Sequence, residues 1–344
     1  MKLFETIQAD RKFAMVDICK FIMAFVVIAI HTNPVVNCTN SIIVQGVIII
    51  EGWAVPFFFI ASGFFLFYNM EKPYSLHLQR MDNYLKKIII LYCAWTFISL
   101  PLAVYGYVHS ENSIIECVLS YIKYFFFVGK LYNSYHLWYL LALIFAVIVI
   151  RFMLKRNIKV RYIVLTAIFF YTMSELMLYI PEYIQNKTGI IYRLFSLYQY
   201  VFNKGGIFTG MIYVVIGMLI AKSRKYINRW LAILAMLGIN FLKIYCYEIV
   251  EDYLNIIEST LFFMIVVGVE IFNKTIYRYL RKASTIIYLS HLLWYSFYSF
   301  IIIREPNKLG LDSFVATSLL SLVNAGLLIV MMRSGKFKWI KKIT

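Results

Sequence analysis

Three ionisable side chains lie within one strongly apolar stretch near the start of the chain. Asp17, Lys20 and His31 all fall within residues 13–33. Ionisable groups in an apolar helix cost free energy, so they are candidates for function. Asp17 and Lys20 are three residues apart and are predicted to form an ion pair on one helical face. A neutral histidine can accept a proton from a hydroxyl near pH 7.

His31 lies eleven residues after Lys20, and this spacing predicts that both side chains share one face of a helix. Eleven residues at about 100° each return to within roughly 20° of the starting direction, with a rise of about 16 Å. An anionic head held at Lys20 would then present its reactive end near His31. The structural alternative is that Asp17 neutralises Lys20 and that His31 caps the helix.

The elements that must position these residues are membrane helices. Of the 344 residues, 62% are hydrophobic and 15% are charged, which excludes a soluble multidomain protein. About 20 residues cross a bilayer. The expected fold is all-α, a polytopic membrane bundle of about ten transmembrane helices in a single domain covering residues 1–344, with no soluble domain. The predicted segments are 13–33, 42–68, 87–108, 136–153, 160–180, 207–221, 229–247, 255–272, 283–303 and 312–332.

The distribution of basic residues predicts the orientation of this bundle. The chain has 34 Lys and Arg against 17 Asp and Glu, and alternate flanks of the ten segments hold 25 and 7 of the basic residues. The richer flanks are expected to face the cytoplasm, so both termini are predicted to be cytoplasmic. His31 and the 109–135 connection are then predicted at the outer side of a cell (plasma) membrane.

The first segment is expected to be a retained helix, because charged residues interrupt it and no small-residue cleavage site follows. The polar connections 69–86 and 181–206 are expected to be loops. The aromatic run at residues 124–127 is expected in the membrane interface.

The five cysteines show no metal-ligand spacing, and no metal is expected. Cys38 and Cys117 both lie in predicted outer loops, and whether they pair stays open.

Three further polar patterns occur in apolar segments. Val55-Pro56-Phe57-Phe58-Phe59-Ile60-Ala61-Ser62-Gly63-Phe64-Phe65-Leu66 places a proline and a Ser-Gly pair within the second segment, where small residues permit close backbone approach. His136-Leu137-Trp138-Tyr139-Leu140 opens the fourth segment, and Tyr288-Leu289-Ser290-His291 lies in the ninth. Taken singly, they are explained by a kink with close packing, an aromatic anchor and a satisfied buried imidazole.

Taken together, the segments resemble the acyltransferase-3 family of integral-membrane acyltransferases. Lys20 through His31 is similar to the family's first-helix motif, a basic residue, ten others and a histidine, and Asp17 stands in the usual place before it. The second-segment pattern is similar to the family's FF-x-x-SGF, and the fourth-segment pattern is similar to its HLWYL. The ninth-segment pattern, Tyr288-Leu289-Ser290-His291, is similar to its YL-x-H. The resemblance covers nearly the whole chain.

The chain departs from the family pattern at its basic residues. Lys20 stands where the family usually has arginine, and the family's arginine pair is approximated by Arg80, Lys86 and Lys87. Lysine keeps the charge but lacks the bidentate fork that grips phosphate. The layout is also similar to the membrane domain of the vancomycin-resistance serine racemases, whose membrane half is thought to handle serine uptake. No racemase domain is expected after the tenth segment.

The resemblance implies an O-acyltransferase that moves an acyl group, with acetyl expected, from cytoplasmic acyl-CoA to a hydroxyl of an envelope glycan or lipid-linked sugar. It implies His31 as general base or transient acyl acceptor, with Asp17 orienting Lys20. The phosphates of acyl-CoA (acetyl-CoA) would be attracted by Lys20, Arg80, Lys86 and Lys87, although ordinary cytoplasmic charge explains the last three equally well. The residues implied on the acceptor side or in support are Ser62, His136, Trp138, Tyr288 and His291. The partners expected are membrane lipid and the glycan or lipid-linked sugar, and no nucleic acid.

The alternative function is a non-catalytic membrane component for uptake of serine or another small polar solute. Such a component needs a polar path through the bundle. Glu175, Lys243 and Glu258 could line such a path, or they could be ion-paired structural residues.

Overall fold

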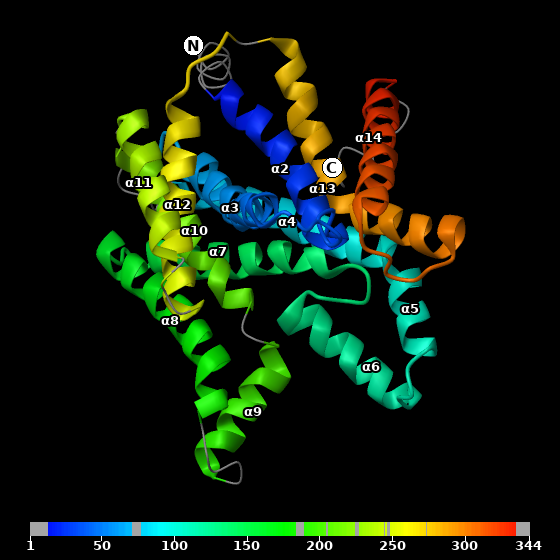
Figure 1. Cartoon of the computed structure of the whole chain (residues 1–344). Helices are drawn as coiled ribbons and strands as arrows, with labels where there is room; N and C mark the ends of the chain where they lie inside the picture. The colour runs from blue at the N-terminus through cyan, green and yellow to red at the C-terminus, as the bar shows by residue number, and fades with distance from the viewer. Residues whose placement is uncertain are drawn as a thin grey trace. The chain divides into compact units, whose positions relative to one another are not determined.

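The computed structural model describes residues 13–70, 77–183, 189–203, 206–223, 227–243, 245, 248–272 and 274–334. The regular elements of these residues are α-helices joined by short π and 3-10 turns (Figure 1). The all-α prediction is therefore confirmed. The helices are α2 Ala14–Thr32, α3 Ser41–Phe67, α4 Leu78–Ile98, α5 Leu100–Val108, α6 Ile114–Lys123, α7 Trp138–Lys155, α8 Val160–Tyr183, α9 Ile190–Phe202, α10 Gly206–Ser223, α11 Arg229–Lys243, α12 Glu248–Gly268, α13 Thr275–Phe297 and α14 Leu311–Arg333, with the turns η2 Tyr124–Val128, η3 Tyr135–Leu137 and η4 Tyr298–Ile303.

Each of the ten predicted apolar segments falls on a helix or a pair of helices. Within the described residues, seven helices are long and apolar enough to cross a membrane, and α4 with α5 would make an eighth if the bent pair is one span. The seven are α2, α3, η3 with α7, α8, α10, α13 with η4, and α14. Helix α11 has only 15 residues. Helix α12 contains four acidic residues. The number of ten spans stays a prediction.

The third predicted segment, 87–108, is not one straight helix. Helix α4 already begins at Leu78, and the chain bends by 46° between α4 and α5. Ser99 precedes α5, and Pro101 lies in its first turn. A proline has no N–H for the preceding turn and clashes with it, which explains the break at this point.

Two connections between the predicted segments contain further helices. The 181–206 loop contains α9, which ends at Asn203 in a left-handed conformation with φ of 43°. Arg193 and Gln199 interrupt its apolar pattern and hid it in the sequence. The 109–135 connection contains α6, which begins with a capping box between Ser113 and Glu116. The predicted interface aromatics form the π turn η2 directly after it.

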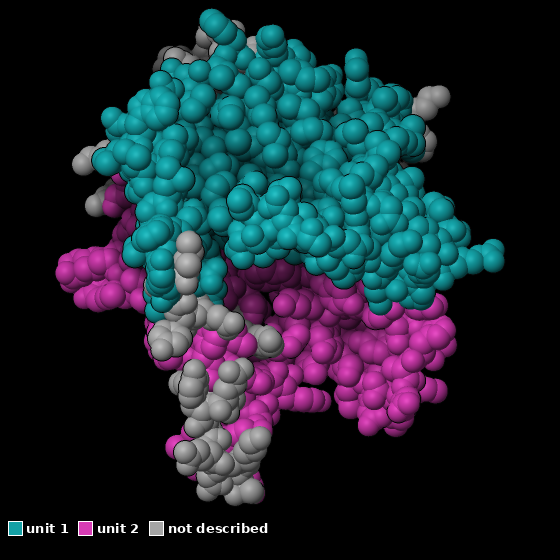
Figure 2. Space-filling view, in the orientation of Figure 1, with its two compact units in different colours: residues 1–61, 224–344 teal, residues 62–223 magenta. Residues whose placement is uncertain are grey.

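The chain divides into two compact units, drawn in teal and magenta in Figure 2. Unit 1 is residues 1–61 with 224–344, and unit 2 is residues 62–223. In unit 1, α13 packs against α2 and α14, and α11 packs against α12. In unit 2, α10 packs against α7 and α8, and α4 packs against α7.

The Ser-Gly pair of the second segment lies where two backbones of unit 2 touch. A Cβ atom built on Gly63 would lie 2.1 Å from the carbonyl oxygen of Val214 in α10. No side chain larger than hydrogen fits there without moving a helix. The sequence-based expectation of a close backbone approach at this pair is confirmed.

Candidate functional site

The histidines of the first and ninth predicted segments are neighbours in unit 1. His31 lies in the last turn of α2, and its ring centroid is 5.3 Å from that of His291 in α13, with the planes 31° apart. His291 is fully buried, and its Nδ1 lies 2.7 Å from the carbonyl oxygen of Tyr288. Since a carbonyl can only accept, we assign the hydrogen of this contact to Nδ1, which makes Nε2 of the neutral ring an acceptor.

This proximity has an electrostatic consequence for both rings. Two imidazolium charges in an apolar, low-dielectric surrounding repel each other strongly. The doubly charged state of His31 and His291 is therefore unfavourable, and a neutral imidazole is the form that accepts a proton. The pair is suited to general-base chemistry at the end of α2.

Aromatic and aliphatic packing holds the histidine pair in place. Tyr288 contacts the ring of Phe58, with centroids 5.4 Å apart, so the second-segment and ninth-segment patterns meet within unit 1. The small residues Ala24 and Ala283, with Ile28, belong to one buried cluster between α2 and α13. Small side chains let the two helices pack closely.

At the other end of α2, the carboxylate of Asp17 is bound by Arg281 of α13. Arg281 Nε donates to Oδ1 at 2.8 Å and Nη2 donates to Oδ2 at 2.7 Å. Asp17 is 1% exposed. A guanidinium matches both oxygens of a carboxylate at once, which an ammonium cannot do. Asp17 thus joins two helices, and its predicted role of orienting Lys20 stays a prediction.

Sequence reasoning missed Arg281 because it stands among flanking basic residues. Arg278 and Lys282 lie close to it, and all three were counted as cytoplasmic charge. Its distinguishing signal is that it lies ten residues before His291, much as Lys20 lies eleven before His31. Helix α13 therefore repeats the arrangement of α2, a cation about three turns before a histidine.

The two contacts show that α2 and α13 run in the same direction (Figure 1, blue and orange). Asp17 and Arg281 lie near the starts of their helices, and His31 and His291 lie later in both. Parallel packing is expected if both are odd-numbered spans that leave the same side of the membrane, as the charge pattern predicts.

The predicted CoA-phosphate residues are divided between the units. Lys20 is a partly buried residue of α2 in unit 1, whereas Lys86 and Lys87 are exposed on α4 in unit 2. Arg80, also on α4, donates to the carbonyl oxygens of Phe65 at 2.6 Å and Tyr68 at 2.9 Å. Carbonyls at the end of a helix lack intrahelical partners, so Arg80 caps α3.

The acceptor-side residues predicted from the second and fourth segments lie in unit 2. The hydroxyls of Ser62 in α3 and Tyr139 in α7 are 2.9 Å apart. His136 is 2% exposed, in the turn η3. Trp138 begins α7, and the Nζ atom of Lys130 lies 5.7 Å from the centroid of its ring. The hydrogen bond between Ser62 and Tyr139 thus connects the Ser-Gly pattern of the second segment with the His136–Leu140 pattern of the fourth.

Two further charged residues in helices of unit 1, Lys243 and Glu258, are paired with each other. Lys243 of α11 forms an ion pair with Glu258 of α12 and donates to Asn255, and Asn240 also donates to Glu258. Glu258 is fully buried. The structural, ion-paired alternative is the one this geometry supports for Lys243 and Glu258. In unit 2, Glu175 is 7% exposed.

The two cysteines that were considered as a pair are both free. Cys38 and Cys117 each carry a thiol outside any disulfide.

Comparison with known proteins agrees with the motifs. A family model described as an acyltransferase domain matches residues 13–332. Among curated proteins, an amino-acid racemase of Enterococcus faecalis is 27% identical over 217 residues, which are 62% of this chain and 29% of the racemase. A serine/alanine racemase of Enterococcus gallinarum is 32% identical over 134 residues, which are 38% of this chain and 18% of that protein. No solved structure matches.

The chain spans less than a third of the length of these racemases, so their names describe proteins of which it covers only a part. The family match covers nearly the whole chain and includes both ends of the α2 and α13 pair. The chain belongs to the acyltransferase-3 family.

Proposed function

We propose that this chain is an integral-membrane O-acyltransferase that moves an acyl group from acyl-CoA to a hydroxyl of an envelope glycan or lipid-linked sugar. The donor is acetyl-CoA in this proposal, and the membrane is the cell membrane. The family match supports the reaction class. The observation that carries the proposal is the contact between His31 and the buried His291.

In the proposed reaction, the neutral imidazole of His31 takes the proton of the acceptor hydroxyl. The hydroxyl oxygen then bonds to the thioester carbonyl carbon, the C–S bond breaks, and CoA leaves as a thiolate that takes up a proton. A transient acyl-imidazole at His31 is the two-step version of the same transfer. His291 acts through His31 as a positioning residue, because its ring lies beside that of His31. In this role His291 is neutral, since a positive charge on it would repel the charge that His31 gains with the proton.

The opposite end of α2 is the proposed place for the donor's phosphates. Lys20 supplies a positive charge about 16 Å from His31 along α2, toward the start of the helix and on nearly the same helical face. The bidentate contact between Asp17 and Arg281 fixes α2 against α13 at this level. A role of Lys86 and Lys87, which are exposed on α4 of unit 2, rests on the family resemblance alone.

The test is CoA release by the purified protein in vesicles that contain acetyl-CoA and an acceptor sugar. His31→Ala should lower the rate at least about 100-fold, the usual contribution of a general base. His77→Ala is the matched control, since His77 precedes α4 without a side-chain cap contact and should keep the wild-type rate. Equal rates for wild type and His31→Ala would remove His31 from the mechanism.

A second candidate function is uptake of serine or another small polar solute without catalysis. The observation in its favour is that curated relatives are named amino-acid racemases. Labelled serine entering vesicles only when they contain the protein, with no CoA release under any acceptor condition, would favour this function. Serine uptake at the rate of empty vesicles would exclude it.

A further inference from the structure

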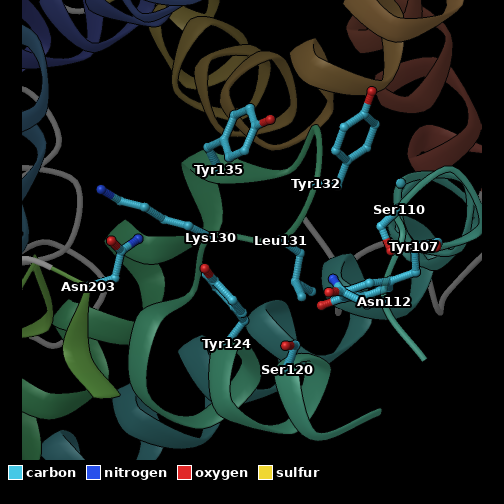
Figure 3. A pocket seen from close by; sticks show the side chains of 11 residues that line it. Tyr107, Ser110, Asn112, Ser120, Tyr124, Lys130, Leu131, Tyr132, Tyr135 and Asn203 are labelled. Carbon is cyan, nitrogen blue, oxygen red and sulfur yellow. Dashed lines mark hydrogen bonds between the residues drawn. The ribbon is translucent and has the colours of Figure 1, made fainter. Parts of the chain in front are cut away.

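Unit 2 contains a polar pocket that none of the predicted catalytic or donor-site residues lines. Its volume is about 530 Å³, and it lies between α5, α6 and the turn before α7 (Figure 3). The lining side chains are rich in hydroxyls and amides, with one cation, Lys130. They include Tyr107, Tyr124, Tyr132, Tyr135, Asn112 and Asn203.

The wall of the pocket is built by two close approaches. A Cβ atom on Gly106 of α5 would lie 2.5 Å from the ring of Tyr132, so that ring lies directly on the helix backbone. Gly129 has φ of 71°, and a Cβ there would lie 2.6 Å from Cα of Trp138. A left-handed residue pressed on a helix start requires glycine. The 129–135 turn is thus held against both α5 and α7.

A second, apolar pocket of about 480 Å³ adjoins the first. It lies between α5 and α6 and is lined by Val104, Val108, Val118 and Ile122, among others. Tyr107, Ser110 and Asn112 line both pockets. The two pockets therefore adjoin at these three residues, so a polar head and an apolar tail of one ligand each have a place on either side of them.

The surroundings of the apolar pocket suit a bilayer rather than water. Ile114, Ile115 and Leu119 of α6 are 84%, 72% and 59% exposed, and Val108 of α5 is 72% exposed. An amphipathic helix with one such face lies at the membrane interface. We therefore expect the polar pocket at the level of the lipid head groups and the apolar pocket beside the first part of the lipid chains.

The side chains that line the polar pocket favour some ligand head groups over others. Tyrosine rings offer flat faces to the C–H groups of a sugar ring, and hydroxyl and amide groups can exchange hydrogen bonds with its hydroxyls. Figure 3 shows Lys130 and Asn203 on one side of the pocket and Tyr107, Ser110 and Asn112 on the other. Of the lining residues that the structure describes, none is acidic. An amino acid would find a partner for its carboxylate there but no counter-charge for its ammonium group.

We propose that these adjoining pockets bind a lipid-linked sugar phosphate, with the sugar and phosphate among the tyrosines and Lys130 and the hydrocarbon chain between α5 and α6. The pocket's position on the predicted outer side would make this lipid the acyl acceptor, and that part of the inference rests on the proposed function. The preference for a charged sugar with a chain follows from the pocket alone and is testable without acyl transfer.

Cys117 provides the readout, because it lines the apolar pocket and is a free thiol. The protein is placed in nanodiscs, and the alkylation rate of Cys117 is followed by peptide mass spectrometry, with Cys38 as the internal control thiol. Three probes are compared. Dodecyl glucosyl phosphodiester has a sugar, a phosphate and a chain; dodecyl glucoside lacks the phosphate, and glucose 1-phosphate lacks the chain.

The phosphodiester should slow alkylation of Cys117 and leave Cys38 unchanged, and dodecyl glucoside should need an about tenfold higher concentration for the same protection. Glucose 1-phosphate should leave Cys117 reactive. Lys130→Met should abolish the difference between the two dodecyl probes. Lys308→Met, which removes a cation from another predicted outer loop, should preserve it. Tyr124→Phe, a second variant that keeps the ring, should weaken both dodecyl probes alike.

Equal protection by the two dodecyl probes in the wild type, an unprotected Cys117, or a phosphate preference that survives Lys130→Met would each overturn the inference. Failure of the proposed function is seen separately, as absence of CoA release. If Cys117 is protected in a Lys130-dependent way but no CoA is released with any acceptor, the binding site stands and the acyl transfer falls. If CoA is released but Cys117 is not protected, the reverse holds.

Discussion

Both carboxylate oxygens of Asp17 accept hydrogen bonds from one guanidinium, that of Arg281, 264 residues away in the sequence. The contact ties the beginning of α2 to α13 at one level, while His31 and His291 meet at another. The helix that carries the proposed base is thus held against the same neighbour at two separate points. This arrangement gives the first prediction.

Removing Arg281 should destabilise the protein, because it would leave a buried carboxylate unpaired. For Arg281→Met we expect a loss toward the lower end of about 3–5 kcal/mol, since the arginine side chain itself is 42% exposed. Arg281→Lys should restore only part of this loss, because lysine lacks the fork. Asp17→Asn combined with Arg281→Met should be milder than the sum of the single changes. The measurement is thermal unfolding in detergent, and strict additivity of the two changes would contradict the contact.

Gly63→Ala should be strongly destabilising, because the new methyl group would overlap the backbone of α10. The expected cost is at the upper end of about 1–3 kcal/mol for overpacking, or higher, since a carbonyl cannot move as a side chain can. Gly46→Ala is the matched control in the same helix, because nothing lies within 4 Å of its Cβ position. The control should be neutral or gain up to about 1 kcal/mol. Similar unfolding midpoints for the two variants would contradict the close approach.

The stability of the first turn of α6 should depend on pH. The backbone N–H of Ser113, followed by its hydroxyl, holds the pKa of the Glu116 carboxyl below its usual range. A lowered pKa means that the ionised form is favoured in the folded state, so its contribution is complete above the unfolded pKa and is lost as pH falls through the lowered value. Hydrogen exchange of the first α6 amides should therefore accelerate at acidic pH. Glu116→Gln should flatten this dependence; an unchanged profile would contradict it.

The orientation is tested by chemical labelling. A cysteine at Asn157, between α7 and α8, should react with an impermeant reagent only after cells are opened, because its flank belongs to the basic-rich set. Native Cys38 should react in intact cells. Labelling in the opposite pattern would invert the membrane orientation and place Lys20 away from cytoplasmic acyl-CoA.

The sequence predicted the helical class, and it predicted the first, second and tenth segments to within one residue at each end, because long apolar runs are decided by local composition. The family resemblance implied that His291 supports the site at His31, and the structure places the two rings next to each other, while their roles stay a prediction. The sequence did not predict the bend at Pro101, nor helix α9, where Arg193 and Gln199 interrupt a short apolar pattern. Shorter amphipathic helices give weaker signals than spans.

The sequence did not predict which side chains of distant helices contact each other. Asp17 has a cation three residues away, and that local candidate concealed Arg281, which tertiary packing brings to both of its oxygens. Likewise, the membership of Arg80 in a basic cluster does not reveal that it caps α3. Such roles depend on helix packing, which spacing alone does not specify.

The most direct test of the central claim is mass spectrometry of envelope glycans and lipid-linked sugars from cells that lack the protein, produce it, or produce His31→Ala at an equal level. An acyl-bearing species should appear with the wild-type chain and be missing from the other two. Identical spectra from all three cell types, or the same acylated species with His31→Ala, would contradict it.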